Sequence, residues 1–301
     1  MLRSEAGFCQ LVLDDGRVVT ARLLKGMKSG PRETTTLAVI GDRVRVATRG
    51  ASAVIEEVCE RSNELSRQAP GRPALRDVLA ANLDVLLLVQ STRNPDFNSA
   101  RLDRFLAIAE QAGVPPVVVL NKIDLVGAEE VARVAGEYVT IGYRVITSSV
   151  KQGVGIEEVR EALHGLAALV GPSGAGKSSL LNAIKPGFRL RTADVSEATS
   201  KGRHTTVASE LLALTPDTYV ADTPGLRSIA LTGVPPEDLD WLFPEFRPFA
   251  RECRFGNCLH QQETGCAVLE ALASGAISQS RYAGYRHLLE EALEQDRTQY
   301  G

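Results

Sequence analysis

Short alternations of apolar and polar residues fill the chain from residue 8 to about residue 60, in the runs FCQLVL, RVVTARLL, TTLAVI, DRVRVAT and SAVIEEV. Turn-forming pairs such as Asp15 with Gly16 and Gly41 with Asp42 separate these runs. A period of two residues between turns predicts short antiparallel strands. Five such strands predict a small β-barrel over residues 1–66, with an OB-type fold as one candidate and an SH3-like barrel as another. A structural cap and a ligand-binding barrel both fit this pattern.

The pattern changes twice after this segment. The stretch SRQAPGRPALRD contains two prolines and alternating charges, which predicts a linker over residues 67–82. From Leu83 onward, apolar runs of strand length (DVLLLVQ, VPPVVVLNK, YRVITSS and LAALVG) alternate with stretches of helical periodicity. Apolar strands interleaved with helices predict a parallel sheet covered on both faces, and hence an α/β domain over residues 83–232. Ligands of such sheets bind at the carboxyl ends of the strands.

A glycine-rich loop follows the run LAALV, directly before the helical stretch SSLLNAIK. It matches GxxxxGK[ST] in the strand-to-helix context that this motif requires. The nucleotide-binding residues predicted here are Gly171, Pro172, Ser173, Gly174, Ala175, Gly176, Lys177, Ser178 and Ser179. Lys177 is expected to reach the β- and γ-phosphates, and Ser178 to ligate Mg²⁺. The sequence therefore predicts a nucleoside triphosphate site.

The tetrapeptide NKID follows the apolar run VVVL and indicates which base is bound. The carboxylate of Asp124 can accept hydrogen bonds from N1–H and the exocyclic amine of guanine, a pair of donors that adenine lacks. Asn121 can hold the neighbouring loop and the purine edge, while the aliphatic stem of Lys122 can cover the ring. Together with the phosphate loop, this motif predicts GTP as the ligand.

Composition and charge restrict how the protein could bind nucleic acid and where in the cell it could act. The chain has 301 residues, of which 44% are hydrophobic and 24% charged, with a net charge of −3. Any nucleic-acid contact must therefore come from local basic patches. No apolar run reaches about eighteen residues, and the first twenty positions carry charges where an export signal would be apolar, so we expect a cytoplasmic protein without a membrane segment.

Three of the five cysteines lie close together near one end of the chain, in the pattern Cys253-x4-Cys258-x-His260-x5-Cys266. Three thiolates and one imidazole satisfy a four-coordinate Zn²⁺ ion. No fifth polar ligand stands out, which favours a closed structural zinc site over a catalytic one. The sequence predicts a zinc-binding, largely helical module over residues 233–301.

The order of the nucleotide motifs resembles that of a circularly permuted GTPase. Ordinary GTPases carry the phosphate loop first, then a switch threonine, DxxG, NKxD and a short serine-containing loop. This chain has NKID, then TSS at 147–149, the phosphate loop, GRHTT at 202–206 and DTPG at 222–225. The cyclic order is kept and only the starting point has moved.

This resemblance implies further site residues. Ser148 and Ser149 belong to the base pocket, with the backbone N–H of Ser149 facing guanine O6. Asp222 holds Mg²⁺ through water, and the N–H of Gly225 senses the γ-phosphate. Thr206, or alternatively Thr205, closes over Mg²⁺ when GTP is bound.

The whole chain resembles the ribosome small subunit-dependent GTPase A (RsgA) family, through the succession of barrel, permuted GTPase and cysteine–histidine module. The segments IGDRV, NKID, GPSGAGKSSLLN, SKGRHTT and DTPG carry this resemblance. It implies a GTP hydrolase that binds the small (30S) ribosomal subunit and its rRNA late in assembly, is stimulated by that subunit and is released on hydrolysis. It also implies an OB-fold that binds rRNA. We expect a monomer.

The hydrolytic residue is less directly indicated. Leu226 stands where Ras-like enzymes carry a water-orienting glutamine after DxxG, and an aliphatic side chain cannot orient water. His204 is a candidate by resemblance and by chemistry, because an imidazole can hydrogen-bond a water molecule. The alternative roles for His204 are an rRNA contact and a cap of the switch loop. For Arg203 the alternatives are stabilisation of the transition-state charge and binding of the phosphate backbone.

Two other functions compete with that of a hydrolytic assembly factor. One is an RNA-binding assembly protein for which GTP is only a conformational ligand and turnover is incidental. The other is a kinase that phosphorylates a small molecule, which NKID and DTPG disfavour because a kinase needs an acceptor site rather than a guanine clamp.

Overall fold

The computed structural model describes residues 1–5, 8–24, 34, 37–49, 52–69, 72–188, 209–223, 226 and 229–300. The chain divides into two compact units. Unit 1 comprises Met1–Leu87, Ile156–Val170 and Lys177–Ile229, and unit 2 comprises Leu88–Gly155, Gly171–Gly176 and Ala230–Gly301.

Unit 1 begins with a mixed sheet. Its strands are β1 (Arg3–Glu5), β2 (Phe8–Val12), β3 (Val18–Leu23), β4 (Val44–Arg49) and β5 (Ser52–Val58), arranged in the order β1-β2-β3-β5-β4. The pair β3–β5 is parallel and the other pairs are antiparallel. Alternate side chains point inward, so a small core forms from Cys9, Leu11, Ala21, Ala53 and Ile55. The β-rich N-terminal segment is thus confirmed, while its closure into an OB-type barrel stays a prediction.

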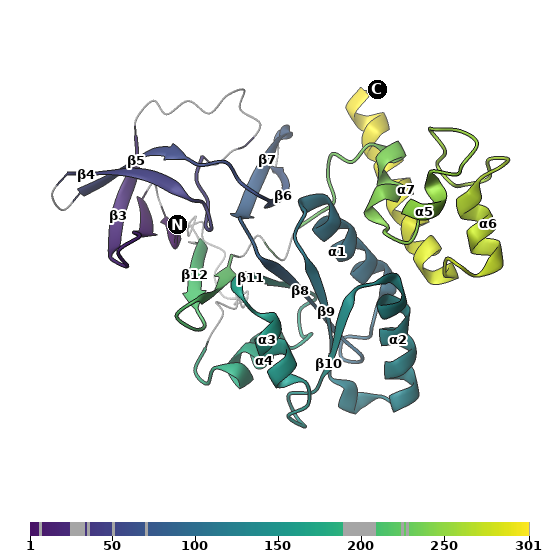
Figure 1. Cartoon of the computed structure of the whole chain (residues 1–301), viewed down its shortest axis with the longest axis horizontal. Helices are drawn as coiled ribbons and strands as arrows, with labels where there is room; N and C mark the ends of the chain where they lie inside the picture. Colours follow the sequence, from purple (N-terminus) through teal and green to yellow (C-terminus); the bar gives the residue numbers. More distant parts are fainter. Residues whose placement is uncertain are drawn as a thin grey trace, which may run out of the picture. The chain divides into compact units, whose positions relative to one another are not determined.

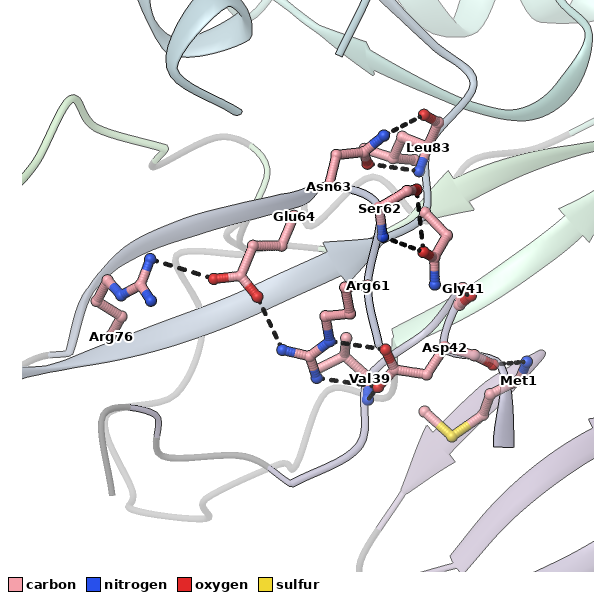
Figure 2. A network of polar contacts seen from close by, with 11 residues as sticks. Met1, Val39, Gly41, Asp42, Arg61, Ser62, Asn63, Glu64, Arg76 and Leu83 are labelled. Carbon is pink, nitrogen blue, oxygen red and sulfur yellow. Dashed lines mark hydrogen bonds and ion pairs between the residues drawn. The ribbon is translucent and has the colours of Figure 1, made fainter. Parts of the chain in front are cut away.

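The run TTLAVI differs from expectation, because its described residues 37–40 form no strand. A buried carboxylate, Asp42, accepts a hydrogen bond from Val39 N at 2.7 Å and so fixes a turn there (Figure 2). Arg61 donates two hydrogen bonds to the same carboxylate, from Nε at 2.8 Å and from Nη2 at 3.0 Å, and a third from Nη1 to Glu64 at 2.8 Å. The segment IGDRV therefore ties the N-terminal sheet to the strand that starts at Glu64.

Gly41, within IGDRV, sits where the backbone leaves no room for a side chain. Its φ is +85°, and a Cβ there would lie 2.0 Å from the carbonyl oxygen of Ala81. The close approach is held by Ala81 N, which donates to Ile40 O at 3.1 Å. A residue other than glycine would have to displace the backbone at Ala81.

The prediction of a linker over residues 67–82 was wrong. Strands β6 (Glu64–Ala69) and β7 (Arg72–Ala81) pair as an antiparallel hairpin across that stretch. The alternating charges that suggested a linker pair across the hairpin instead, with Arg67 Nε 3.5 Å from Asp77 and Arg76 Nη1 3.2 Å from Glu64. The apolar side chains of Leu65 and Val78 in this hairpin are buried.

The remainder of unit 1 carries part of the α/β domain. Strand β11 (Gly165–Val170) pairs in parallel with β13 (Thr218–Asp222), and β12 (Ser209–Ala213) pairs antiparallel with both β13 and β1. Helices α3 (Ile156–Ala162) and α4 (Lys177–Ile184) contact each other. The predicted strand LAALV and the helix that follows the phosphate loop are confirmed.

Unit 2 holds the rest of the α/β domain. Strands β10 (Arg144–Ser148), β9 (Pro116–Asn121) and the Leu88–Ser91 part of β8 (Val85–Ser91) are neighbours in this order, and β9 and β10 are parallel. Helix α1 (Ser99–Ala112) begins where Asn98 caps Arg101 N, and α2 (Ala128–Ile141) follows β9. Strand β8 is buried at every position, as the apolar run predicted.

The C-terminal part of unit 2 is mainly helical. It contains η3 (Pro236–Leu242), α5 (Arg247–Ala250), α6 (Ala267–Ser274) and α7 (Gln279–Tyr300), and α7 packs on α1 (Figure 1). Among the described residues, none of the helices is both long enough and apolar enough to cross a membrane.

A buried ionic cluster joins α7 to α1 and α2. Arg281, 1% exposed, donates to Asp103 at 2.5 Å and to Glu245 at 2.6 Å, and Tyr138 OH donates to Asp103 at 3.1 Å. Burial raises the pKa of Asp103 to about 6, although Arg281 and Tyr138 lower it. Burial by itself lowers the pKa of Arg281, but the nearby carboxylates outweigh it and the net pKa is raised, so the guanidinium stays charged.

Candidate nucleotide and metal sites

The phosphate loop leaves β11 after Val170, and α4 begins at Lys177 directly beyond it. Lys177, Ser178 and Ser179 therefore form the first turn of α4, where a helix N-terminus favours anions. Asp222 ends β13, the parallel neighbour of β11, so it lies at the same edge of the sheet from which the loop departs. This arrangement agrees with the predicted triphosphate and Mg²⁺ roles.

The guanine loop starts at the end of β9. Asn121 is the last residue of that strand and is 2% exposed. Lys122 adopts a left-handed conformation with φ +61° and ψ +37°, which turns the chain into η1 (Ile123–Leu125). Asp124 lies within η1 and accepts a hydrogen bond from the hydroxyl of Ser149 at 2.6 Å.

The two loops meet, although 54 positions separate them. Asn121 Nδ2 donates to the carbonyl oxygen of Ala175 at 2.9 Å. Gly176, with φ +99°, lies so close that a Cβ there would stand 2.2 Å from Asn121 Nδ2. Ser148 holds the other end of the amide, since its hydroxyl donates to Asn121 Oδ1 at 3.1 Å. The convergence that the cyclic motif order predicts is present within unit 2.

The role expected for the Ser149 backbone requires a correction. Ser149 N donates to the carbonyl oxygen of Val154 at 3.0 Å, which closes a small turn with a reciprocal bond from Val154 N. That N–H is therefore already hydrogen-bonded within the turn. The hydroxyl of Ser149 is what contacts the guanine loop, through Asp124.

Several predicted residues lie outside the described part of the chain, namely Arg203, His204, Thr205, Thr206 and Gly225. Leu226 is described, and it is only 5% exposed. A buried aliphatic side chain directly after DTPG agrees with the expectation that this position does not orient water.

The predicted zinc ligands form one cluster. The donor atoms of Cys253, Cys258, His260 and Cys266 all lie within 4.8 Å of one another. His260 Nδ1 is 3.6 Å from Cys253 Sγ and 3.3 Å from Cys266 Sγ, and these two sulfurs are 3.9 Å apart. In a tetrahedral zinc site the bond lengths imply sulfur–sulfur separations of about 3.8 Å and sulfur–nitrogen separations of about 3.5 Å. The residues present fit the ion.

The sequence did not indicate Asp240, which orients His260, one of the predicted zinc ligands. Asp240 Oδ2 lies 3.0 Å from His260 Nε2, so Nδ1 is the nitrogen that faces the cysteines. A carboxylate on the outer nitrogen fixes the orientation of a metal-bound imidazole. Asp240 lies in η3, 20 positions before His260, and no motif spacing connects the two.

Buried surroundings also shape the thiols of this cluster. Burial raises the pKa of Cys258 to about 12, and it raises the pKa of Cys266 as well. Tyr282 OH and Tyr285 OH donate to the carbonyl oxygens of His260 and Leu259, at 2.7 and 3.0 Å. Helix α7 thus holds the backbone of the ligand loop, and a bound cation would supply the charge that stabilises the thiolates.

Comparison with known proteins agrees with the motifs. The family model described as RsgA GTPase matches residues 58–232. A protein of Gemmatimonas aurantiaca named small ribosomal subunit biogenesis GTPase RsgA is 40% identical over 297 residues, which cover 97% of this chain and 96% of the relative. A protein of the same name from Geobacillus thermodenitrificans is 38% identical over 299 residues, which cover 98% and 97% of the two chains.

Two solved structures resemble the whole chain. YjeQ from Thermotoga maritima superposes with a TM-score of 0.77 at 31% identity, covering 97% of this chain and 98% of that one. YloQ, described as a circularly permuted GTPase, superposes with a TM-score of 0.73 at 30% identity, covering 98% and 94%. The chain therefore belongs to the RsgA GTPase family and has the fold of a circularly permuted GTPase.

Proposed function

We propose that this protein hydrolyses GTP as a late-stage assembly factor of the small ribosomal subunit, binds the rRNA of that subunit and is released on hydrolysis. The contact of Asn121 with Ala175 carries the nucleotide part, because it joins a base-reading loop and a phosphate loop at one place. The names of the relatives support the ribosomal part. The protein acts as a cytoplasmic monomer and has no membrane partner.

Guanine is selected by the loop that Asp124 occupies. The carboxylate accepts from N1–H and the exocyclic amine, Asn121 faces the purine edge, and the Lys122 stem covers the ring. The N–H of Val150 faces O6, since that of Ser149 is bonded to Val154. ATP is rejected because its base would leave the carboxylate without donors.

The phosphates lie on the loop from Gly171 to Gly176 and the first turn of α4, with Lys177 against the β- and γ-phosphates. When bound, Mg²⁺ would supply charge that neutralises the phosphates. Ser178 and Thr206 would hold the ion, and Asp222 would do so through water. The resemblance to GTPases assigns the N–H of Gly225 to the γ-phosphate.

Hydrolysis depends on His204, which orients the attacking water in place of the missing glutamine. We expect GTP turnover to rise severalfold or more when purified 30S subunits are added. In His204→Ala we expect the maximal rate to fall at least about tenfold, with little change in KM. Steady-state phosphate release with and without 30S measures both. Absence of stimulation would favour the alternative, a GTP-responsive RNA-binding assembly protein with incidental turnover. A loss of subunit affinity alone in His204→Ala would make this residue an rRNA contact.

One structural zinc ion binds Cys253, Cys258, His260 and Cys266 and stabilises the C-terminal module. Cys258→Ser is expected to lower the metal content from about one zinc per chain and to weaken what remains, because a neutral hydroxyl replaces a thiolate ligand. Elemental analysis and chelator competition measure this. Cys59→Ser, outside the cluster, is the matched control and should keep its zinc. Full zinc content in Cys258→Ser would contradict the ligand set.

A further inference from the structure

The loop between β8 and α1 touches the guanine loop, although it contains none of the nucleotide motifs. Thr92, the first residue of this loop, is 4% exposed. Its backbone N donates to Asn121 O at 3.0 Å, and its hydroxyl donates to Lys122 O at 2.6 Å. Thr92 thus binds consecutive carbonyl groups of the NKID motif.

The Lys122 carbonyl is the point at which the guanine loop changes direction. Lys122 has a left-handed backbone conformation, which is unfavourable for most residues other than glycine and asparagine. Its carbonyl oxygen accepts one hydrogen bond from the Thr92 hydroxyl and another from Leu125 N at 3.0 Å. Because both lone pairs of this oxygen accept hydrogen bonds, the orientation of the peptide group between Lys122 and Ile123, just before Asp124, is fixed.

The same loop reaches the phosphate loop. The ammonium of Lys122 donates to the carbonyl oxygen of Asn94. A methyl group at Gly174 would lie 3.4 Å from Pro95 Cδ and 3.8 Å from Asn94 O, which is ordinary contact distance. The loop therefore supports the guanine loop on one side and adjoins the phosphate loop on the other.

We infer that Thr92 is a positioning residue for guanine recognition, acting through the Lys122 carbonyl to place the Asp124 carboxylate against the base. The inference rests on the proposed nucleotide site and adds a residue that the motifs do not contain. A buried threonine that serves only the stability of the fold is the competing explanation, and base selectivity separates the two. IDP lacks the exocyclic amine of GDP, so it forms one bond fewer to Asp124 and is less sensitive to the position of that carboxylate.

Thr92→Val keeps the shape of the side chain and removes the hydroxyl. We expect its affinity for GDP to fall about threefold to tenfold and its preference for GDP over IDP to narrow by about threefold, since one neutral hydrogen bond is lost. Thr92→Ser retains the hydroxyl and should restore both values. Thr140→Val, whose hydroxyl donates to Gly136 O within α2, is the matched control and should change neither. Calorimetric titration of the full chain with each nucleotide measures all four proteins, and Thr92→Ala replaces Thr92→Val if that variant does not fold.

Equal losses of GDP and IDP affinity in Thr92→Val would overturn the inference, and so would a lower melting temperature with unchanged binding. Failure of Thr92→Ser to restore selectivity would also overturn it. If the unmodified protein shows no preference for GDP over IDP, the proposed role of Asp124 fails and the role of Thr92 fails with it. If the unmodified protein prefers GDP over IDP and Thr92→Val keeps that preference, the role of Thr92 is ruled out and that of Asp124 stands.

Discussion

Replacing Asp124 by Asn is expected to move the preference of this protein from GTP to xanthosine triphosphate. The amide offers a donor to the C2 carbonyl of xanthine and withdraws an acceptor from the two donors of guanine. Since each lost bond to a carboxylate counts as a charged hydrogen bond, GTP affinity should fall at least about 100-fold. The Ser149 hydroxyl, 2.6 Å from Asp124 Oδ1, can donate equally to an amide oxygen, so the loop should keep its shape.

Competition binding with GTP and xanthosine triphosphate measures this change of preference. Asp217→Asn, at an exposed turn position between β12 and β13, is the matched control and should behave as the unmodified protein does. If Asp124→Asn kept full selectivity for GTP, Asp124 would have no place in the base pocket.

Replacing Arg281 by Met is expected to lower the free energy of unfolding by about 3–5 kcal/mol. The substitution leaves Asp103, which is 1% exposed, and the nearby Glu245 without their counter-charge, and buried carboxylates without a partner are costly. Chemical denaturation followed by circular dichroism measures the loss. Arg297→Met, in an exposed pair with Glu294 on the same helix, should change the free energy by less than about 0.5 kcal/mol.

A second substitution shows whether the charge itself is responsible. Asp103→Asn in the Arg281→Met background removes one of the stranded carboxylates, so the double variant should lose less than the sum of the two single losses. Additive losses would mean that Arg281 acts through packing on Phe243, whose ring its guanidinium covers at 4.6 Å.

The features that could be predicted from sequence are those whose chemistry is local. The phosphate loop, the guanine motif and the metal ligands each depend on a short spacing. The cyclic order of the motifs predicted that the guanine loop and the phosphate loop converge, and the contact of Asn121 with Ala175 is where they do so. The role expected for the Ser149 backbone could not be checked from the sequence, because only the fold shows that its N–H donates to the carbonyl oxygen of Val154.

Residues that act across the fold could not be predicted in this way. Thr92 and Asp240 bind their partners 30 and 20 positions away, and neither distance belongs to a motif. The hairpin of β6 and β7 was mistaken for a linker because mixed charges with proline and glycine are typical of loops, whereas here Arg67 and Asp77 face each other across strands. A turn replaces the predicted strand at Val39 because the N–H of Val39 donates a hydrogen bond to the carboxylate of Asp42.

The ion pair between Asp103 and Arg281 joins residues 178 positions apart, which sets a delay during translation. At about 5–20 residues per second, a ribosome needs on the order of 10 to 40 s to make the intervening chain. Throughout that interval helix α1 carries an acidic side chain on its otherwise apolar face, and no cation is yet there to neutralise it. The nascent α/β domain should therefore mature only after the start of α7 has left the exit tunnel.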